Sequence, residues 1–139
     1  MAVGDHTFAV EVLTPEGEVF NGEVVQLSTR TMVGEVGILA NHSPLLASLK
    51  PTELRLKISE TETRRYAQSH GMLQVYGNHA QVLVEEAIAP KDLDTATLEA
   101  ELADAEQRLG DAAEESAARS RAEKDRDRAA TFLKIAQGN

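Results

Sequence analysis

The sequence predicts a mainly β domain, residues 1–90, followed by a C-terminal two-helix hairpin, residues 91–139. The spacing of apolar residues supports this division, because it alternates in several short runs before Pro90 and becomes helical after it. The charge supports it too. The net charge is −5 over residues 1–90, −7 over 91–118 and +3 over 119–139, so the acidic and basic halves of the hairpin can attract each other.

Short apolar runs separated by turn residues predict an antiparallel sandwich or barrel for the first domain. Alternation over residues 7–13 places Phe8, Val10 and Val12 on one face of a first strand. A turn follows at residues 14–17, which include a Pro and a Gly. Further strand candidates are residues 24–29, 54–58, 65–68, 72–76 and 81–84, and hairpin signals occur at Asn21-Gly22 and Gly77-Asn78.

Residues 34–49 are interpreted as an ordered connection that is partly buried. Gly34 and Gly37 lie three positions apart, which fits a tight turn or a close approach of two backbones. His42 and Pro44 then interrupt an otherwise apolar run. Because ordered connections on a rigid scaffold often carry binding residues, this segment is the first candidate for a docking site.

The second domain is predicted to be a helical hairpin that is held together weakly. Pro90 ends the β region, and Asp92 is the predicted N-cap of the first helix, with Asp94 favourable in its first turn. Residues 110–111 interrupt the helical pattern, and a second helix is expected over residues 114–136. The predicted contact positions are Leu98, Leu102, Ala105 and Leu109 on the first helix and Ala118, Ala122, Ala129, Leu133 and Ala136 on the second. Since Ala buries little apolar area, we expect that a partner could rearrange this hairpin.

Composition excludes several classes of function. A net charge of −9 argues against non-specific binding to nucleic acid. The absence of Cys removes disulfides, thiolate zinc sites and Cys nucleophiles, and suits a cytosolic setting. No apolar run approaches the roughly 20 residues that span a bilayer. Residues 1–6 lack the basic and apolar regions of a signal peptide, so we expect an intracellular protein.

Residues that carry chemistry do not form a catalytic or metal-binding pattern. The four His residues, His6, His42, His70 and His79, are scattered, without the spacing of metal ligands. No Gly-rich segment resembles a phosphate-binding loop. We therefore expect no metal, no cofactor and no catalytic residue in this chain.

A basic run near the C-terminus is open to two interpretations. Its residues are Arg119, Arg121, Lys124, Arg126 and Arg128, and acidic residues are interspersed among them. On a helix, Arg121, Lys124 and Arg128 form one basic stripe. The stripe is either a solvated face or a surface that docks on an acidic protein, where charge complementarity would set association rate and register.

Several blocks of the first domain together resemble the epsilon subunit of the rotary F-type ATP synthase. The most specific block is Gly34-Glu35-Val36-Gly37-Ile38 followed by Asn41-His42-Ser43-Pro44-Leu45-Leu46. The supporting blocks, in the same order and spacing, are residues 15–23, 49–51, 71–75 and 82–88. The resemblance covers the chain from Phe8 to about Asp94, and the remaining residues match by architecture and charge pattern.

The resemblance implies a flattened antiparallel β-sandwich of about ten strands, followed by a two-helix hairpin. It implies a non-catalytic subunit of the rotor, which binds the gamma shaft and rests on the c ring. It also implies a peripheral place on the cytoplasmic face of the cell membrane. In bacterial members the helical arm can extend toward the alpha and beta subunits and block ATP hydrolysis, so both subunits are expected partners.

The resemblance also assigns roles to particular positions. Gly34, Glu35 and Gly37 match the loop that meets the c ring, and His42 and Leu45 match positions close to gamma. For His42, a hydrogen-bonded loop histidine is an equally good interpretation. The five basic residues of the second helix match, by position and charge, the segment that meets an acidic stretch of beta.

One family motif is incomplete in this chain. Some bacterial members bind ATP through an Ile/Leu-Asp-x-x-Arg-Ala motif at the start of the first helix. Leu93 and Asp94 are present here, but Thr97 and Leu98 replace the Arg and the Ala. Without the guanidinium group, a phosphate loses its bidentate hydrogen bonds, so we expect ATP binding to be absent or very weak. The alternative function, a nucleotide-sensing regulator that binds ATP between sandwich and helices, is correspondingly less favoured.

Overall fold

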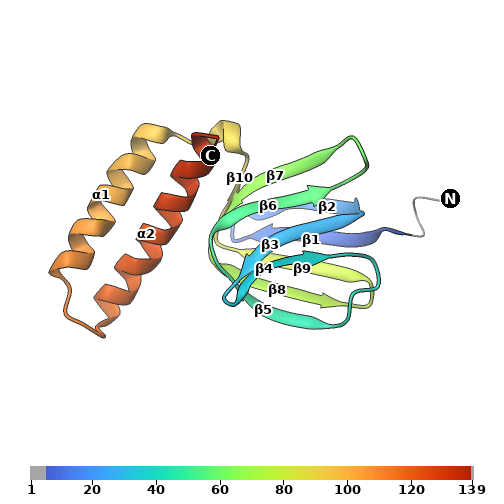
Figure 1. Cartoon of the computed structure of the whole chain (residues 1–139), viewed down its shortest axis with the longest axis horizontal. Helices are drawn as coiled ribbons and strands as arrows, with labels where there is room; N and C mark the ends of the chain where they lie inside the picture. The colour runs from blue at the N-terminus through green and yellow to red at the C-terminus, as the bar shows by residue number, and fades with distance from the viewer. Residues whose placement is uncertain (1–5, 139) are drawn as a thin grey trace. The chain divides into compact units, whose positions relative to one another are not determined.

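The structure of this protein is a computed structural model that describes residues 6–138. The chain divides into two compact units, Met1–Ile88 and Ala89–Asn139. The first unit is built from strands and the second from helices, as Figure 1 shows. Each unit has its own buried residues and is described by itself below.

Ten strands form the first unit. They are β1 (Phe8–Thr14), β2 (Gly17–Val24), β3 (Gln26–Thr31), β4 (Gly34–Ile38), β5 (Leu45–Leu49), β6 (Thr52–Lys57), β7 (Thr63–Gln68), β8 (Gly71–Tyr76), β9 (His79–Val84) and β10 (Ala87–Ile88). The strand order is β10-β7-β6-β3-β5-β8-β9-β1-β2, with β4 paired to β3. The strands curl into a sandwich, which confirms the predicted fold class (Figure 1). The pairing is antiparallel apart from β1 and β9, which are parallel.

Alternating side chains make the core of the sandwich. In β1, Phe8, Val10 and Val12 are buried, as the sequence predicts. The same alternation is present in β9, where Val82 and Val84 point inward and the intervening Leu83 points outward. Full burial of a Val, Leu or Phe side chain stabilises a fold by about 1.5–3 kcal/mol, so this core holds the strands that carry the outer surfaces described below.

The prediction of a hairpin at Asn21-Gly22 is wrong. Both residues lie inside β2, where Asn21 pairs with Glu11 and Gly22 pairs with Val10. The Gly is explained by packing, since a Cβ on Gly22 would lie 3.3 Å from the ring of Phe20. The predicted strand over residues 24–29 is likewise two strands, because β2 ends at Val24 and β3 begins at Gln26.

The segment 34–49 is ordered, as predicted, but much of it is strand rather than connection. β4 pairs along its whole length with β3, and β5 pairs with β8. The Gly residues of β4 obscure its alternation, and glycine is uncommon in strands, so the sequence favoured a loop. Only Leu39–Pro44 remains as a loop between the two strands.

The second unit contains a short 3₁₀ turn, η2 (Pro90–Asp92), and two helices, α1 (Thr95–Asp111) and α2 (Ala117–Ala136). The predicted N-cap at Asp92 is wrong. Asp92 belongs to the 3₁₀ turn, and Asp94 caps α1 by accepting hydrogen bonds from the backbone N–H groups of Ala96 and Thr97. Ser116 caps α2 in the same way, through the N–H of Arg119.

Four of the nine predicted contact positions of α1 and α2 are buried, four are half-buried, and Ala118 is exposed, so its predicted place in the contact is wrong. The buried residues of these helices are Leu98 and Ala105 on α1 and Ala122, Ala129 and Phe132 on α2. Three of the five are Ala, so apolar burial between the helices is small. Ion pairs between the helices therefore contribute a larger share of the interaction than they would in a Leu-rich bundle.

Candidate functional site

Four large apolar side chains lie exposed on the outer side of neighbouring strands in the sandwich. They are Leu46 on β5, Met72 and Tyr76 on β8, and Leu83 on β9, which we call the apolar face. Leu46 is 69% exposed and Tyr76 is 66% exposed. Single exposed apolar residues are ordinary, but several on adjacent strands are typical of a docking surface.

The strand register places these four residues on one side. Met72 pairs with Leu83 on β9 and with Ser48 on β5. Leu46 lies two positions from Ser48, and Tyr76 lies four positions from Met72, so the two-residue period turns all of them outward. Figure 1 shows β5, β8 and β9 side by side, with no other strand of the sandwich between them.

The structure separates the two neighbouring Leu residues of β5. Leu45, expected from the resemblance to lie near gamma, packs against the core of the sandwich. Leu46 has the opposite orientation and belongs to the apolar face. The strand geometry thus makes Leu46 the residue of this pair that is available to a partner.

The loop Leu39–Pro44 follows the end of β4 and carries His42. Its first four residues form a turn in which the N–H of His42 donates to the carbonyl of Leu39 at 3.2 Å. His42 is half-buried, and its Nδ1 lies 2.7 Å from the carbonyl oxygen of Ser43. Because a carbonyl can only accept, Nδ1 of His42 is the donor in this contact. Leu39, 58% exposed, adds apolar area in this loop.

The tip between β3 and β4 is a second exposed feature. Met32 and Val33 occupy the turn, and Val33 is 98% exposed. Thr31 orders the turn, since its hydroxyl accepts from the N–H of Val33 and donates to the carbonyl of Gly34. Gly34 has φ of +133°, a conformation that favours Gly. Glu35 is exposed, and its backbone lies opposite that of Arg30 in the register of β3 and β4.

A polar groove of about 370 Å³ lies beside this tip, on the outer side of β3, β4 and β6. Its lining includes Gln26 and Ser28 from β3, Glu35 and Gly37 from β4, and Arg55 from β6. A Cβ on Gly37 would lie 3.3 Å from Nε2 of Gln26, so a larger residue there would narrow the groove. Of the three residues expected at the c ring, Glu35 and Gly37 line this groove, whereas Gly34 lies at the start of β4 and does not.

The five basic residues of α2 do not share one environment. Arg128 reaches back to α1, where its Nη1 lies 3.5 Å from Oε1 of Glu101. Arg126 donates to Asp127 at 3.2 Å. Arg121 and Lys124 are exposed, and neither has a hydrogen bond or ion pair within the described range 6–138. The predicted stripe is therefore divided, because Arg121 and Lys124 face solvent whereas Arg128 forms an ion pair with α1.

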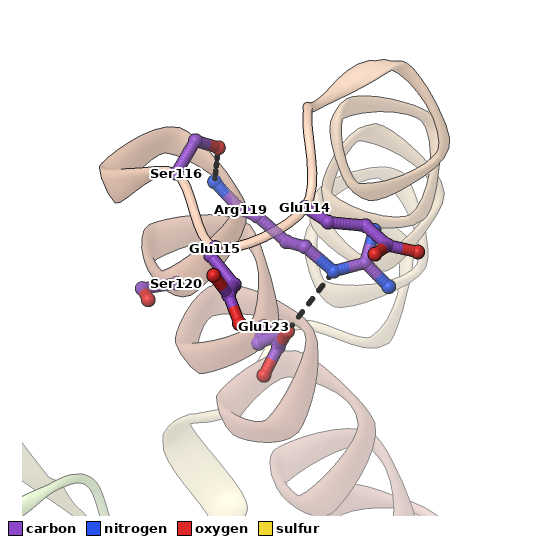
Figure 2. Close-up of a pocket in the computed structure, with 6 residues that line it drawn as sticks. All are labelled: Glu114, Glu115, Ser116, Arg119, Ser120 and Glu123. Atoms are coloured by element: carbon purple, nitrogen blue, oxygen red, sulfur yellow. Dashed lines mark hydrogen bonds and ion pairs between the residues drawn. The ribbon is translucent and has the colours of Figure 1, made fainter.

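Arg119 is held at the connection between the helices. Its Nη1 donates to the carbonyl of Leu109 at 3.2 Å, and its Nε lies 3.4 Å from Oε1 of Glu123. Arg119 is one of six residues that line a hollow of about 290 Å³, and the lining is mostly Glu and Ser. Figure 2 shows the side chain of Arg119 reaching toward Glu123. The remaining lining residues are Glu114, Glu115, Ser116 and Ser120. With its carboxylates facing solvent, this hollow is a well-hydrated surface feature.

The start of α1 shows what the incomplete nucleotide motif does in this chain. Oδ1 of Asp94 accepts from the N–H of Ala96 at 3.1 Å, and Oδ2 accepts from the Thr97 hydroxyl at 2.9 Å. The two hydrogen bonds from Thr97 lower the pKa of Asp94 most, and the hydrogen bond from Ala96 lowers it further. Leu93 is half-buried and Leu98 is buried. Both carboxylate oxygens of Asp94 are thus occupied within the helix cap.

Sequence reasoning did not find the apolar face or the apolar tip. The signal for the face was present as outward positions in strands that had been predicted, notably Met72 and Leu83. These positions could be recognised as one surface only from the strand register, which places Met72 opposite Leu83. Met32 and Val33 were detectable as two apolar residues at a turn, where polar residues are usual.

Within residues 6–138, neither helix combines the length and apolar character needed to cross a bilayer. Within the same residues, no three His, Asp or Glu side chains gather in a way that could hold a metal ion.

Comparison with known proteins connects this chain to one family. The profile of the family described as "ATP synthase, Delta/Epsilon chain, beta-sandwich domain" matches residues 7–90. The ATP synthase epsilon chain of Halalkalibacterium halodurans is 37% identical over 130 residues, covering 94% of this chain and 97% of that one. The epsilon chain of Persephonella marina is 47% identical over 87 residues, which span 63% of this chain and 64% of that one.

A solved structure has the same fold. A chain in the Euglena gracilis mitochondrial ATP synthase, in a structure of its OSCP, F1 and c ring, superposes with a TM-score of 0.77. The superposition covers 95% of this chain and 81% of that chain, at 20% sequence identity. At this identity the likeness concerns the fold, and it includes the order of sandwich and helices.

Proposed function

The chain belongs to the delta/epsilon family of ATP synthase subunits, and from this premise we propose that it is the epsilon subunit of a rotary ATP synthase. In this role it is a non-catalytic part of the central stalk that links the gamma shaft to the c ring. It couples proton flow to ATP synthesis by turning with the rotor. The observation that carries the proposal is the apolar face, a docking surface on a rigid sandwich that matches the family profile.

We propose that the apolar face and the loop Leu39–Pro44 bind gamma. Leu46 and Tyr76 expose most of their side chains, so burying them against another subunit would remove a large apolar area from water. His42 lies in the same loop, where its half-buried ring adds a polar group to this surface. This surface combines an apolar centre with a polar edge, which is the usual composition of a protein interface.

The tip between β3 and β4 supports the proposed contact with the c ring. Val33 is almost fully exposed, and the turn that carries it is ordered by Thr31. Glu35 and the polar groove next to the tip offer hydrogen-bond acceptors to polar loops of a partner. The complex would therefore be held at the cytoplasmic face of the cell membrane through its c ring, with this subunit peripheral.

We propose that α1 and α2 form a regulatory arm, residues 91–139, which inhibits ATP hydrolysis through contacts with alpha and beta. Arg121 and Lys124 lie one helical turn apart and are exposed, so they can approach an acidic surface directly. Arg119 and Arg128 are bonded to α1 in the hairpin. They would reach a partner only after the helices separate, which makes the opening of the hairpin part of the proposed inhibition.

A pair of matched substitutions tests the gamma interface. Leu46→Glu places a charge on the apolar face, whereas Val33→Glu places the same charge on the tip. Both side chains are exposed, so both variants should fold. In gel filtration with purified gamma, we expect wild type and Val33→Glu to co-elute with gamma and Leu46→Glu to elute alone. Co-elution of Leu46→Glu at wild-type affinity would contradict the proposed interface.

A further inference from the structure

Asn78 makes contacts that its position in a tight turn does not require. Gly77 and Asn78 both have φ of 59° and connect β8 to β9, as in a type I′ hairpin turn. Asn tolerates this conformation, and the turn needs nothing more from its side chain. The carboxamide of Asn78 nevertheless bonds to two segments that are distant in the sequence.

The first bond holds the loop that carries His42. Oδ1 of Asn78 accepts from the backbone N–H of Asn41 at 2.7 Å. Asn41 also has a positive φ, 63°, and occupies the third position of the turn closed by Leu39 and His42. Asn adopts this conformation more readily than other non-Gly residues, and an external hydrogen bond to its amide favours this turn over alternatives.

The second bond ties the same side chain to Thr7, the residue that precedes β1. Nδ2 of Asn78 donates to the carbonyl of Thr7 at 3.0 Å, and the carbonyl of Asn78 accepts from Ala9 at 3.3 Å. An amide N–H can only donate and a carbonyl can only accept. The N–H of Asn41 and the carbonyl of Thr7 therefore fix the orientation of the Asn78 carboxamide, with Oδ1 toward Asn41 and Nδ2 toward Thr7. Asn78 therefore anchors the loop to a strand whose side chains form the core.

We propose that Asn78 is the positioning residue of the gamma-binding surface, holding the turn Leu39–His42 at the end of the apolar face. Tyr76 of that face lies two residues before Asn78, so the anchor and the exposed aromatic side chain share one hairpin. The hydrogen bond from Asn41 to Asn78 fixes the positions of Leu39 and His42. Gamma therefore binds a surface that is already ordered, which lowers the entropic cost of association. This inference rests on the proposed binding of gamma.

Two substitutions of Asn78 separate its two bonds. Asn78→Gly removes both bonds but keeps a residue that adopts positive φ readily, so the β8–β9 turn should persist. Asn78→Asp keeps an acceptor for Asn41 and loses the donor to Thr7. We expect the affinity for purified gamma to fall about five- to twenty-fold in Asn78→Gly and less than about three-fold in Asn78→Asp. Amide hydrogen exchange at Asn41 should become faster in Asn78→Gly alone.

A double-substitution cycle distinguishes positioning from general stability. If Asn78 acts through the turn, Asn78→Gly should cost little further affinity in a Leu39→Ala background. Unchanged gamma affinity in Asn78→Gly, or equal losses in the Gly and Asp variants, would overturn the proposal. Additive losses in the cycle would overturn it as well. If wild type itself fails to bind gamma, the proposed function is contradicted, and exchange at Asn41 still reports whether the anchor exists.

Discussion

At the scale of single residues, Asp94 organises the start of α1. Its two carboxylate oxygens accept three hydrogen bonds from Ala96 and Thr97, including one from the Thr97 hydroxyl. In the family motif for ATP, an Arg stands at the position of Thr97. In this chain Thr97 instead donates to Asp94 in the helix cap and offers no guanidinium group to a phosphate.

We therefore expect the isolated chain to bind ATP very weakly or not at all. Titration calorimetry with Mg-ATP measures this directly. The variant Thr97→Arg, which restores the guanidinium group, is a useful comparison and should bind more tightly than wild type if the rest of the site is present. Tight binding by the wild-type chain at a one-to-one ratio would contradict the account of Asp94.

The lowered pKa of Asp94 gives a pH dependence with a definite sign. Hydrogen bonds from Thr97 and Ala96 favour the charged carboxylate. The cap is therefore fully present above the ordinary pKa of 3.8 and is lost as the pH falls through the lower pKa of the folded chain. NMR shifts of the Ala96 and Thr97 amides should stay constant from neutral pH to about pH 4 and move below it. Movement near neutral pH would contradict this assignment.

Gly71 is a residue whose replacement should disrupt the sandwich. A Cβ at this position would lie 2.0 Å from the carbonyl oxygen of Leu83 and 2.7 Å from the Cα of Val84, so β8 and β9 would have to separate. We expect Gly71→Ala to lower the free energy of unfolding by about 3 kcal/mol or more. Gly110, with nothing within 4 Å of an added Cβ, is the control. Gly110→Ala in α1 should be neutral or stabilising by up to about 1 kcal/mol. Chemical denaturation of both variants measures these changes.

At the scale of elements, the hairpin of α1 and α2 is joined by ion pairs over a narrow apolar contact. Arg108 bridges the helices, donating to Asp104 at 2.8 Å and to Asp125 at 2.9 Å. These two carboxylates raise the pKa of Arg108, with Asp104 having the larger effect. The pairs are solvent-exposed, so each contributes little to the stability of the hairpin and weakens with salt.

The two partners of Arg108 supply a matched test of this arrangement. Asp125→Asn removes an ion pair between the helices, whereas Asp104→Asn removes one within α1. We expect Asp125→Asn to increase the population of separated helices, and Asp104→Asn to leave it nearly unchanged. Distances between spin labels at the far ends of α1 and α2 measure that population. Equal distance distributions in wild type and Asp125→Asn at low salt would show that the pair does not hold the hairpin.

The elements also show where sequence patterns were sufficient. The helices were predicted because Leu98, Leu102 and Ala105 recur with helical spacing. β4 was not predicted, since its two Gly residues hide the alternation of Val36 and Ile38. The N-cap was placed two residues early because aspartates occur at both 92 and 94, and only the hydrogen bonds distinguish them.

At the scale of the whole molecule, the sequence predicted the order of a sandwich and two helices, and its resemblance to a family is confirmed. The surfaces were harder to predict. The apolar face depends on strand register, which brings Met72 beside Leu83 across eleven positions of sequence. The division of the basic stripe depends on which Arg side chains reach α1. Such properties arise from tertiary contacts, and periodicity within one element does not encode them.

The measurement that tests the central claim most directly is ATP hydrolysis by a reconstituted alpha, beta and gamma complex. Three samples are compared: the complex alone, the complex with the full chain, and the complex with the chain truncated after Lys91. The account predicts that both forms of the chain bind the complex through gamma and that only the full chain suppresses hydrolysis. Failure of both forms to bind the complex would contradict the assignment as a central-stalk subunit. Binding of both forms without suppression by either would contradict the inhibitory role of the helical arm.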